Sequence, residues 1–166
     1  MYKAIDIAYW FLAQNDMKQT ENNSGEDGYE GLTNMKIQKL LYFAQGIYFT
    51  FKNEKLFSEK IYAWDHGPVV RQVYNEFKEF GREYINYKED KKFNATIIEK
   101  IEHDKKVRDV LVDIFDCLNR YTAWQLRNIS HDPNGPWFKV FNNKKYDVIP
   151  LDDFLTDYFR SLFELE

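Results

Sequence analysis

The sequence has little of what marks secreted or membrane-embedded proteins. It contains one cysteine, Cys117, which excludes an intrachain disulfide framework and fits a reducing compartment. No apolar run reaches the roughly 20 residues that a membrane-spanning helix needs. The first residues, interrupted by Asp6, lack a small-residue cleavage site, so we do not expect a signal peptide. These features predict a soluble, cytoplasmic protein without a membrane partner.

The motifs of common enzyme classes are also missing. The sequence has no H-E-x-x-H or C-x-x-C metal motif, no G-x-S-x-G nucleophile motif, and neither phosphate-binding signature, G-x-x-x-x-G-K-[ST] or G-x-G-x-x-G. A net charge of −4 argues against a broad nucleic-acid-binding surface. We therefore predict no catalytic residues, no metal, no cofactor and no nucleic-acid partner.

Aromatic residues are abundant instead, with 14 Phe, 12 Tyr and 4 Trp among 166 residues. This supply of apolar side chains predicts a packed core, in one domain that spans residues 1–166. Charge is unevenly distributed, because residues 33–80 carry seven Lys or Arg against five acids, whereas residues 147–166 carry six acids against Arg160 alone. The basic middle could face an acidic partner, although a solvated mixed surface is the simpler interpretation.

The strongest pattern in the chain starts at Thr33 or Asn34, either of which can cap a helix. Apolar side chains then recur at three- and four-residue steps, at Ile37, Leu40, Leu41, Ala44, Ile47, Tyr48 and Phe51. Further aromatic side chains on the other side predict a central helix that is covered on several faces. Gly46 should let another element approach closely. The aromatic run is also compatible with a strand, which periodicity alone does not settle.

A short strand and a sharp turn are predicted after this helix. Ile61–Trp64 has the composition of a strand, and Asp65–Pro68 stops it. Pro68 suits the first position of a second helix, because its fixed φ fits and its missing N–H has no partner there in any case. That helix would end at Gly81. The strand's tryptophan should be largely buried, and Gly67 should adopt a backbone conformation that other residues avoid.

The remaining segments are predicted to be mainly helical. The expected helices are Tyr2–Gln14, Asp104–Asn119, Ala123–Ile129, a short helix begun by Pro136, and a closing helix from Leu151. Thr122-Ala123-Trp124-Gln125 matches a capping box. Tyr84–Tyr87 and Val148-Ile149 are predicted short strands, Phe93–Ile101 could be strand or helix, and Cys117 should pack as a small apolar group. The fold class is mainly α, one helical domain around the central hydrophobic helix with a small β element.

One long connection interrupts this pattern. Asn15–Gly31 holds five acids, three Gly and three Asn, and it has almost nothing to bury. We predict a mobile acidic loop there. An insertion without a dedicated role is the favoured interpretation, and a partner-binding loop is the alternative.

Three sequence boxes carry a resemblance to a known family. They are KIQKLLYFAQ at Lys36–Gln45, AWDHGPV at Ala63–Val69 and SHDPNGPW at Ser130–Trp137. In this order they resemble the boxes of the Panacea domain, also called the SocA-like or phage-associated GepA-like domain. That family typically shows K-L-Q-K-L-L-Y-F-A-Q, A-W-x-x-G-P-V and T-H-x-x-x-P-W. Here Ile37 replaces Leu, Ser130 replaces Thr, and the last spacer is longer.

The resemblance implies a mostly helical antitoxin that pairs with a toxin encoded beside it; one family member is a proteolytic adaptor. It also implies structural roles for the motif residues Gln38, Tyr42, Gln45, Trp64, Gly67, Pro68, Val69, His131, Pro136 and Trp137. We expect the partner to bind exposed residues near the Gly-Pro turn, of which the best candidates are Lys36, Lys39, Asp65, His66 and Arg71.

Other functions remain open at this stage. His66 and His131, each beside an acid and a proline, could meet and form the centre of a metal- or His-dependent hydrolase. Alternatively, each imidazole could bond a backbone carbonyl and hold its turn. The same scaffold could serve as a phage-encoded inhibitor of a host defence system. The helix predicted at Val69–Lys78 could touch DNA, and Lys36 with Lys39 could contact RNA, but the overall charge disfavours both.

Overall fold

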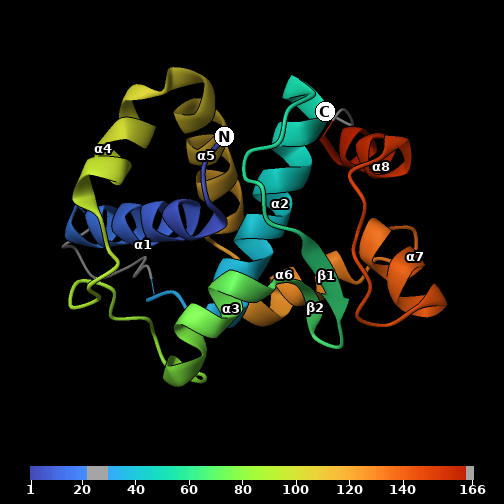
Figure 1. Cartoon of the computed structure of the whole chain (residues 1–166), viewed down its shortest axis with the longest axis horizontal. Coiled ribbons are helices and arrows are strands. Elements are labelled where there is room, and N and C mark those ends of the chain that lie inside the picture. Colours follow the sequence, from blue (N-terminus) through green and yellow to red (C-terminus); the bar gives the residue numbers. More distant parts are fainter. Residues whose placement is uncertain (22–29, 164–166) are drawn as a thin grey trace.

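A computed structural model of the chain describes residues 1–21 and 30–163, which are arranged as shown in Figure 1. The fold is mainly α, as predicted. Its helices are α1 (Ala4–Glu21), α2 (Asn34–Lys52), α3 (Arg71–Phe77), the 3-10 helix η1 (Lys78–Phe80), α4 (Ala95–His103), α5 (Lys105–Leu118), α6 (Ala123–Ser130), α7 (Pro136–Asn143) and α8 (Asp153–Phe163). One small antiparallel sheet pairs β1 (Ile61–Trp64) with β2 (Gly67–Val70). None of the described helices combines the length and apolar character that crossing a bilayer requires.

Helix α2 lies at the centre, in contact with α1, α3, α5, α6, α8 and β2. The Thr33 hydroxyl accepts a hydrogen bond from the Lys36 N–H at 3.2 Å and caps the helix, as predicted. Gly46 explains how α8 packs so closely against it. A Cβ on this residue would lie 2.3 Å from the Phe159 ring, so only glycine fits without a shift of α8.

The strands form a hairpin in which Trp64 pairs with Gly67, so that Asp65 and His66 make a two-residue turn. Gly67 has φ of +105°, which confirms that this position needs a conformation that other residues avoid. The prediction that Pro68 begins a helix is wrong. Pro68 lies within β2, and α3 begins three residues later at Arg71.

Hydrogen bonding explains why the sheet accepts this proline. Ala63, the partner of Pro68, donates its N–H to Asp147 O at 2.9 Å and accepts from the Tyr146 N–H at 2.8 Å. The backbone N–H and C=O of Ala63 therefore point away from β2, so the pairing of the strands does not require an N–H donor at Pro68. Residues 146–149 run along the outer side of β1, although the strand predicted at Val148-Ile149 is reduced to one isolated bridge, between Tyr62 and Val148.

Helix α1 is longer than the predicted Tyr2–Gln14. The prediction of a loop is therefore wrong for residues 15–21, which are helical. The helix continues to Glu21. Asn15, expected in the loop, is buried and donates to Glu30 O at 3.0 Å, while its own Oδ1 accepts from the Asn119 side chain at 3.0 Å. These buried amide bonds hold the helix in register with α5. Residues 22–29 of the predicted loop lie outside the described residues.

Two smaller predictions also need correction. Tyr84–Tyr87 forms only an isolated bridge from Tyr84 to Thr33 rather than a strand. Cys117 is exposed on α5 rather than packed as a small apolar group, because it lies outside the buried apolar face of that helix. The segment that could have been strand or helix becomes α4. The capping box at Thr122 and the helix begun by Pro136 are confirmed.

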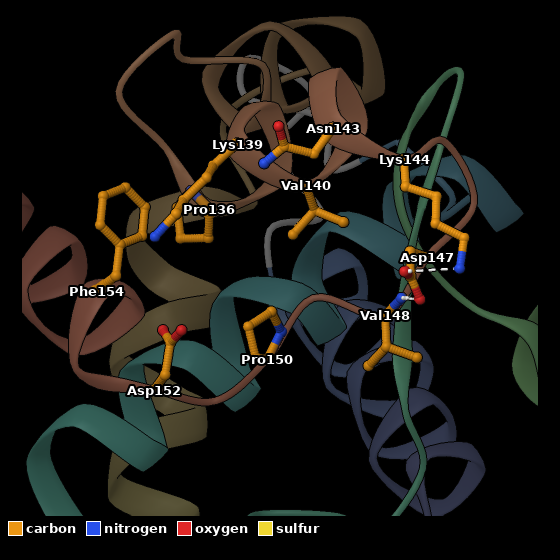
Figure 2. A pocket seen from close by; sticks show the side chains of 10 residues that line it. All are labelled: Pro136, Lys139, Val140, Asn143, Lys144, Asp147, Val148, Pro150, Asp152 and Phe154. Atoms are coloured by element: carbon orange, nitrogen blue, oxygen red, sulfur yellow. Dashed lines mark hydrogen bonds and ion pairs between the residues drawn. The ribbon is translucent and has the colours of Figure 1, made fainter.

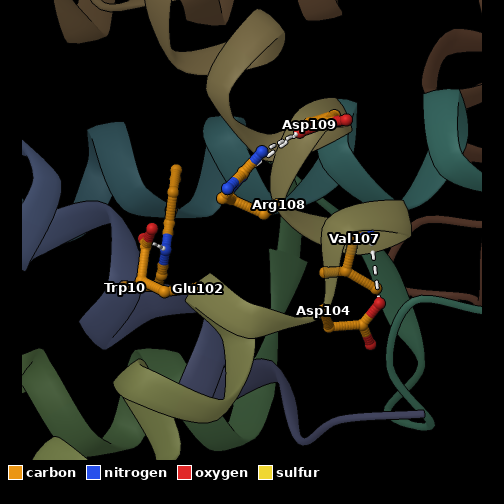
Figure 3. Close-up of polar contacts among 6 residues, drawn as sticks. All are labelled: Trp10, Glu102, Asp104, Val107, Arg108 and Asp109. Atoms are coloured by element: carbon orange, nitrogen blue, oxygen red, sulfur yellow. Dashed lines mark hydrogen bonds and ion pairs between the residues drawn. The ribbon is translucent and has the colours of Figure 1, made fainter.

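Polar contacts join the layer formed by α1, α4 and α5. Trp10 is fully buried, and its indole N–H donates to Glu102 of α4 (Figure 3). Asp104, between α4 and α5, accepts from the Val107 N–H at 3.3 Å and caps α5. On the outside of α5, Arg108 forms an ion pair with its neighbour Asp109.

Candidate functional site

The first two sequence boxes meet where α2 covers the outer edge of β2. The Val70 N–H donates to Gln38 Oε1 at 2.8 Å, and Gln38 in turn donates to Asn34 Oδ1 at 3.0 Å. The Lys39 ammonium donates to Pro68 O at 3.4 Å. An edge strand presents unpaired backbone groups, and here two side chains of α2 take them.

The third box closes on the hairpin turn from the other side. Trp137 Nε1 donates to Trp64 O at 3.0 Å, and the His131 ring lies 3.7 Å from the Trp137 ring, measured between centroids. His131 Nε2 is 3.3 Å from Asp65 O, and its Nδ1 is 2.7 Å from Arg127 O. Burial lowers the pKa of His131. These contacts fit the interpretation in which the histidine bonds carbonyls and holds its turn.

Two further motif residues of α2 have structural contacts: Gln45 binds the segment before the hairpin, and Tyr42 packs in the core. The Gln45 Oε1 accepts from the Leu56 and Phe57 N–H groups at 2.9 and 3.2 Å, and its Nε2 donates to Phe57 O at 2.9 Å. Tyr42 packs edge-to-face on Phe43 and Phe159. Burial raises the pKa of the Tyr42 hydroxyl well above its usual value.

A pocket of about 620 Å³ opens beside the hairpin, between α2, the Asp65-His66 turn, α3 with η1, and α6. We call it the hairpin pocket. It is lined by Asn34, Met35, Gln38, Lys39, Trp64, Asp65, His66, Val69, Tyr74, Lys78, Gly81, Arg82, Trp124 and Tyr146. Its volume falls in the range of about 300–1,000 Å³ that is usual for ligand sites.

Lys39 forms part of the pocket wall, and its exposure differs from the prediction. Both Lys36 and Lys39 were expected at the surface, yet only 8% and 1% of their areas are exposed. Burial, with the nearby Arg127 charge, lowers the pKa of Lys39 to about 7. Lys36 does not line the hairpin pocket; its ammonium donates to Asn119 O at 2.6 Å, and burial lowers its pKa to about 8.

The other three predicted partner-binding residues are exposed, as expected. Asp65 and His66 line the hairpin pocket. The Asp65 carboxylate accepts from the Tyr146 hydroxyl and lies 4.0 Å from the Lys145 ammonium. Arg71 is outside the pocket, with its guanidinium 3.7 Å from the centroid of the Tyr62 ring.

Trp64 is partly exposed, with most of its area buried. Its ring stands edge-to-face on Tyr74 at 5.0 Å, measured between centroids. Its indole nitrogen is shut off from solvent and has no acceptor within the described part of the chain. An indole N–H buried without an acceptor is unfavourable, so this donor is one of the unusual features of the pocket. No pattern in the sequence indicated that the Trp64 indole N–H would lack an acceptor.

The structure gives the two histidines different surroundings. His66 lines the pocket, whereas His131 packs on Trp137 and meets the turn through the Asp65 carbonyl. Among residues 1–21 and 30–163, no three His, Cys, Asp or Glu side chains are grouped as a metal site would need. The boxes converge, but their contacts are those of packing and turn support.

A second pocket, of about 260 Å³, lies between α7 and residues 147–152 (Figure 2). Its charges are largely paired. Lys144 and Asp147 form an ion pair at 3.2 Å, and the Lys139 ammonium lies 3.8 Å from the centroid of the Phe154 ring. The Asp152 carboxylate caps α8 by accepting from the Leu155 N–H at 2.9 Å. This smaller pocket therefore offers a ligand fewer free polar groups than the hairpin pocket.

Comparison with known proteins supports the importance of these boxes. The family described as "Antitoxin SocA-like, Panacea domain" matches residues 37–138, which hold most of the three boxes and the whole hairpin. The chain belongs to the SocA-like Panacea family. It is 32% identical over 114 residues to "Antitoxin SocA" of Caulobacter vibrioides (strain NA1000 / CB15N), an alignment that covers 67% of this chain. The chain spans about 61% of the length of that curated relative. No solved structure matches the chain.

The matched residues 37–138 of the Panacea domain include the elements that build the hairpin pocket, with two exceptions. Of the lining residues, Asn34 and Met35 precede the match, and Tyr146 follows it. Most of the hairpin pocket therefore lies within the part of the chain that matches the family. It is the candidate functional site of this chain.

Proposed function

We propose that this chain is an antitoxin that neutralises a cognate toxin by direct protein–protein contact, and that it works in the cytoplasm. Membership of the SocA-like Panacea family supports an antitoxin-like role. Neutralisation by contact, without chemistry of its own, is our further step. It agrees with the contacts of His131, which are to backbone carbonyls and to Trp137.

The observation that carries the proposal is the aromatic rim of the hairpin pocket. Tyr74, Trp124 and Tyr146 are exposed large side chains that surround the pocket, and 55% of the area of Trp124 is accessible. Tyrosine, tryptophan and arginine dominate the binding energy of protein interfaces. Arg127 lies 4.6 Å from the Trp124 ring centroid and extends this surface over α6. We propose that the toxin binds here, over the turn that contains Asp65 and His66.

The proposed partner is encoded by an adjacent gene. The test expresses the neighbouring gene alone and together with this chain, and follows growth and co-purification. We expect growth arrest that this chain relieves, and a stoichiometric complex of the two proteins. Trp124→Ala should weaken both the relief of growth arrest and the formation of the complex. The control Phe154→Ala, which removes an exposed aromatic side chain at the second pocket, should weaken neither.

The opposing outcome is equally specific. A harmless neighbour and no bound protein would contradict the antitoxin proposal. Metal-dependent hydrolysis that is abolished by His131→Ala, but not by Trp124→Ala, would favour an enzyme instead.

A further inference from the structure

The hairpin pocket is unbalanced in charge. Lys39 lies in its buried wall, and Lys78 and Arg82 stand at its exposed rim. Against these cations the lining holds a single acid, Asp65, which is already engaged by Tyr146 and Lys145. Within the described residues neither Lys78 nor Arg82 has an ion pair. The pocket is thus locally cationic in a chain whose net charge is −4.

Two buried donors at the pocket are incompletely paired. The Lys39 ammonium has three N–H groups, and its hydrogen bond to the Pro68 carbonyl is long, at 3.4 Å. The Trp64 indole N–H has none in the described part of the chain. Buried donors normally find acceptors, and the exceptions concentrate at sites where something else supplies them.

We propose that the hairpin pocket binds the carboxylate of an acidic side chain presented by the protein partner. This inference rests on the proposed function, since the carboxylate would belong to the toxin, and it names the chemistry of that contact. The carboxylate would accept from Lys39 in the wall, and the exposed cations Lys78 and Arg82 would attract it.

The size and lining of the pocket define the acidic segment further. About 620 Å³ is more than one carboxylate side chain fills, so an apolar neighbour enters as well. Tyr74, Val69 and the face of Trp64 offer that neighbour apolar contact. Asp65 disfavours a polyanion because its negative charge lies in the same wall. A short acidic-aromatic segment fits these conditions better than a phosphate backbone.

The test uses the full chain and three probes, observed by two-dimensional 1H–15N NMR. The probes are the blocked peptide Ac-Ala-Glu-Phe-Ala-NH2, its glutamine counterpart Ac-Ala-Gln-Phe-Ala-NH2, and inorganic phosphate. We expect the glutamate peptide to shift the Trp64 indole N–H and the backbone amides of Gly67, Val69 and Val70. The glutamine peptide should bind about tenfold more weakly, since it lacks the charge-assisted hydrogen bonds.

Matched variants make the result specific to this pocket. Lys39→Met should remove the preference for glutamate, whereas Lys91→Met, which removes an exposed charge elsewhere, should leave it unchanged. If Lys39→Met does not fold, the double variant Lys78→Gln/Arg82→Gln carries the test and should lower the preference severalfold. Equal binding of the two peptides, or shifts away from the pocket, would overturn the inference. Phosphate binding tighter than that of the glutamate peptide would overturn it in favour of a phosphate ligand.

A separate readout distinguishes this inference from the proposed function. If Lys39→Met and the Lys78→Gln/Arg82→Gln variant capture and neutralise the neighbouring gene product as well as the wild-type chain does, the carboxylate inference fails while the antitoxin proposal stands. If no chain binds that product, the antitoxin proposal fails, and with it the assignment of the carboxylate to a toxin.

Discussion

Lys36 and Lys39 lie one turn apart on α2, and both are buried, but their surroundings differ. The Lys36 ammonium donates to Asn119 O at 2.6 Å, where Asn119 ends α5. A cation at a helix C-terminus is favoured by the helix dipole, so this lysine joins two helices. The Lys39 ammonium has a longer contact of 3.4 Å to the hairpin and borders a pocket.

Two tryptophans repeat this contrast. Trp10, between α1 and α4, is fully buried and donates its indole N–H to Glu102. Trp64, at the hairpin, is partly exposed and has no acceptor in the described residues. One side of the molecule therefore pairs its buried donors and serves stability. The hairpin side leaves buried donors incompletely paired, which is unusual in a structure that serves stability alone.

The largest effect should come from truncating the two tryptophans. Trp10→Ala should lower the free energy of unfolding by about 3–5 kcal/mol, since it empties a fully buried site. Trp64→Ala should lower it by only about 1–2 kcal/mol, because that side chain is partly exposed whereas Trp10 is fully buried. Urea unfolding of both variants measures the difference, and equal losses would contradict the contrast.

Gly67→Ala should have the next largest effect, a loss of about 2–3 kcal/mol. Its φ of +105° strains any other residue, and the new Cβ would lie 2.8 Å from Lys39 Cε. A double-mutant cycle with Lys39→Ala separates these causes. The contact with Lys39 should vanish in that background, whereas the 3.0 Å approach to Ser130 Oγ and the backbone strain should remain, with a coupling of about 1 kcal/mol. Zero coupling would show that Lys39 does not pack against Gly67.

Replacing each buried lysine by methionine should change stability in opposite directions. Lys36→Met leaves the Asn119 carbonyl without its donor, and we expect a loss of about 1–2 kcal/mol. Lys39→Met removes a buried charge that has one long hydrogen bond, and we expect a gain of about 1–2 kcal/mol at pH 6. Denaturant unfolding at one pH compares the two. A loss in both variants would mean that Lys39 is structural as well.

The gain from Lys39→Met should also depend on pH. The folded-state pKa of Lys39, about 7, lies below its unfolded value of 10.5. Below pH 7 the lysine is charged in both states, and the penalty of burying that charge is complete. As pH rises from 7 towards 10.5, the folded state releases its proton first, so the wild-type chain gains stability. The advantage of Lys39→Met should therefore shrink between pH 6 and pH 9.

Several charged and titratable groups surround this lysine and shape its titration. They are Arg127 on α6, His131 after it, Asp65 and His66 in the turn, Lys78 on η1, and Arg82. Lys36, whose pKa is about 8, adds a similar dependence of the free energy of unfolding on pH, at slightly higher pH. This contribution cancels when the wild-type chain is compared with Lys39→Met, because Lys36 is present in both chains. A pH-independent difference between them would mean that Lys39 does not titrate in this range.

Local patterns predicted much of this fold, because their causes are local. The Thr33 cap, the apolar stripe of α2 and the capping box at Thr122 are fixed by residues within a few positions of one another. Pro68 was misplaced because a proline suits both the start of a helix and an edge strand. The deciding fact, the hydrogen bonding of Ala63 to residues 146 and 147, comes from far along the chain.

The site was harder to predict for the same reason. Family resemblance singled out Gln38, Trp64 and His131, but not what they touch. Gln38 binds Val70, which is 32 residues away, and His131 meets Asp65, which is 66 residues away. Lysine is usually exposed, so nothing in the sequence indicated that Lys39 is buried beneath Gly67.

The smallest effects on stability should come from two exposed arginines, and they sharpen the location of the partner surface. Arg71 lies over the Tyr62 ring at 3.7 Å, so Arg71→Glu should lower the free energy of unfolding by about 0.5–1 kcal/mol. Arg82 has neither a cation–π contact nor an ion pair within the described residues, so Arg82→Glu should change the free energy of unfolding by less than about 0.5 kcal/mol.

Binding should follow the opposite order, because Arg82 lines the hairpin pocket and Arg71 does not. Arg82→Glu should reverse the attraction for an acidic partner and slow association most at low salt. Arg71→Glu should act mainly through the hairpin's packing, because Arg71 contacts the Tyr62 ring. Thermal unfolding of each variant, beside co-purification with the neighbouring gene product at two salt concentrations, measures both orders. If Arg71→Glu weakens capture more than Arg82→Glu at matched stability, the partner contacts the outer face of the hairpin and not the pocket.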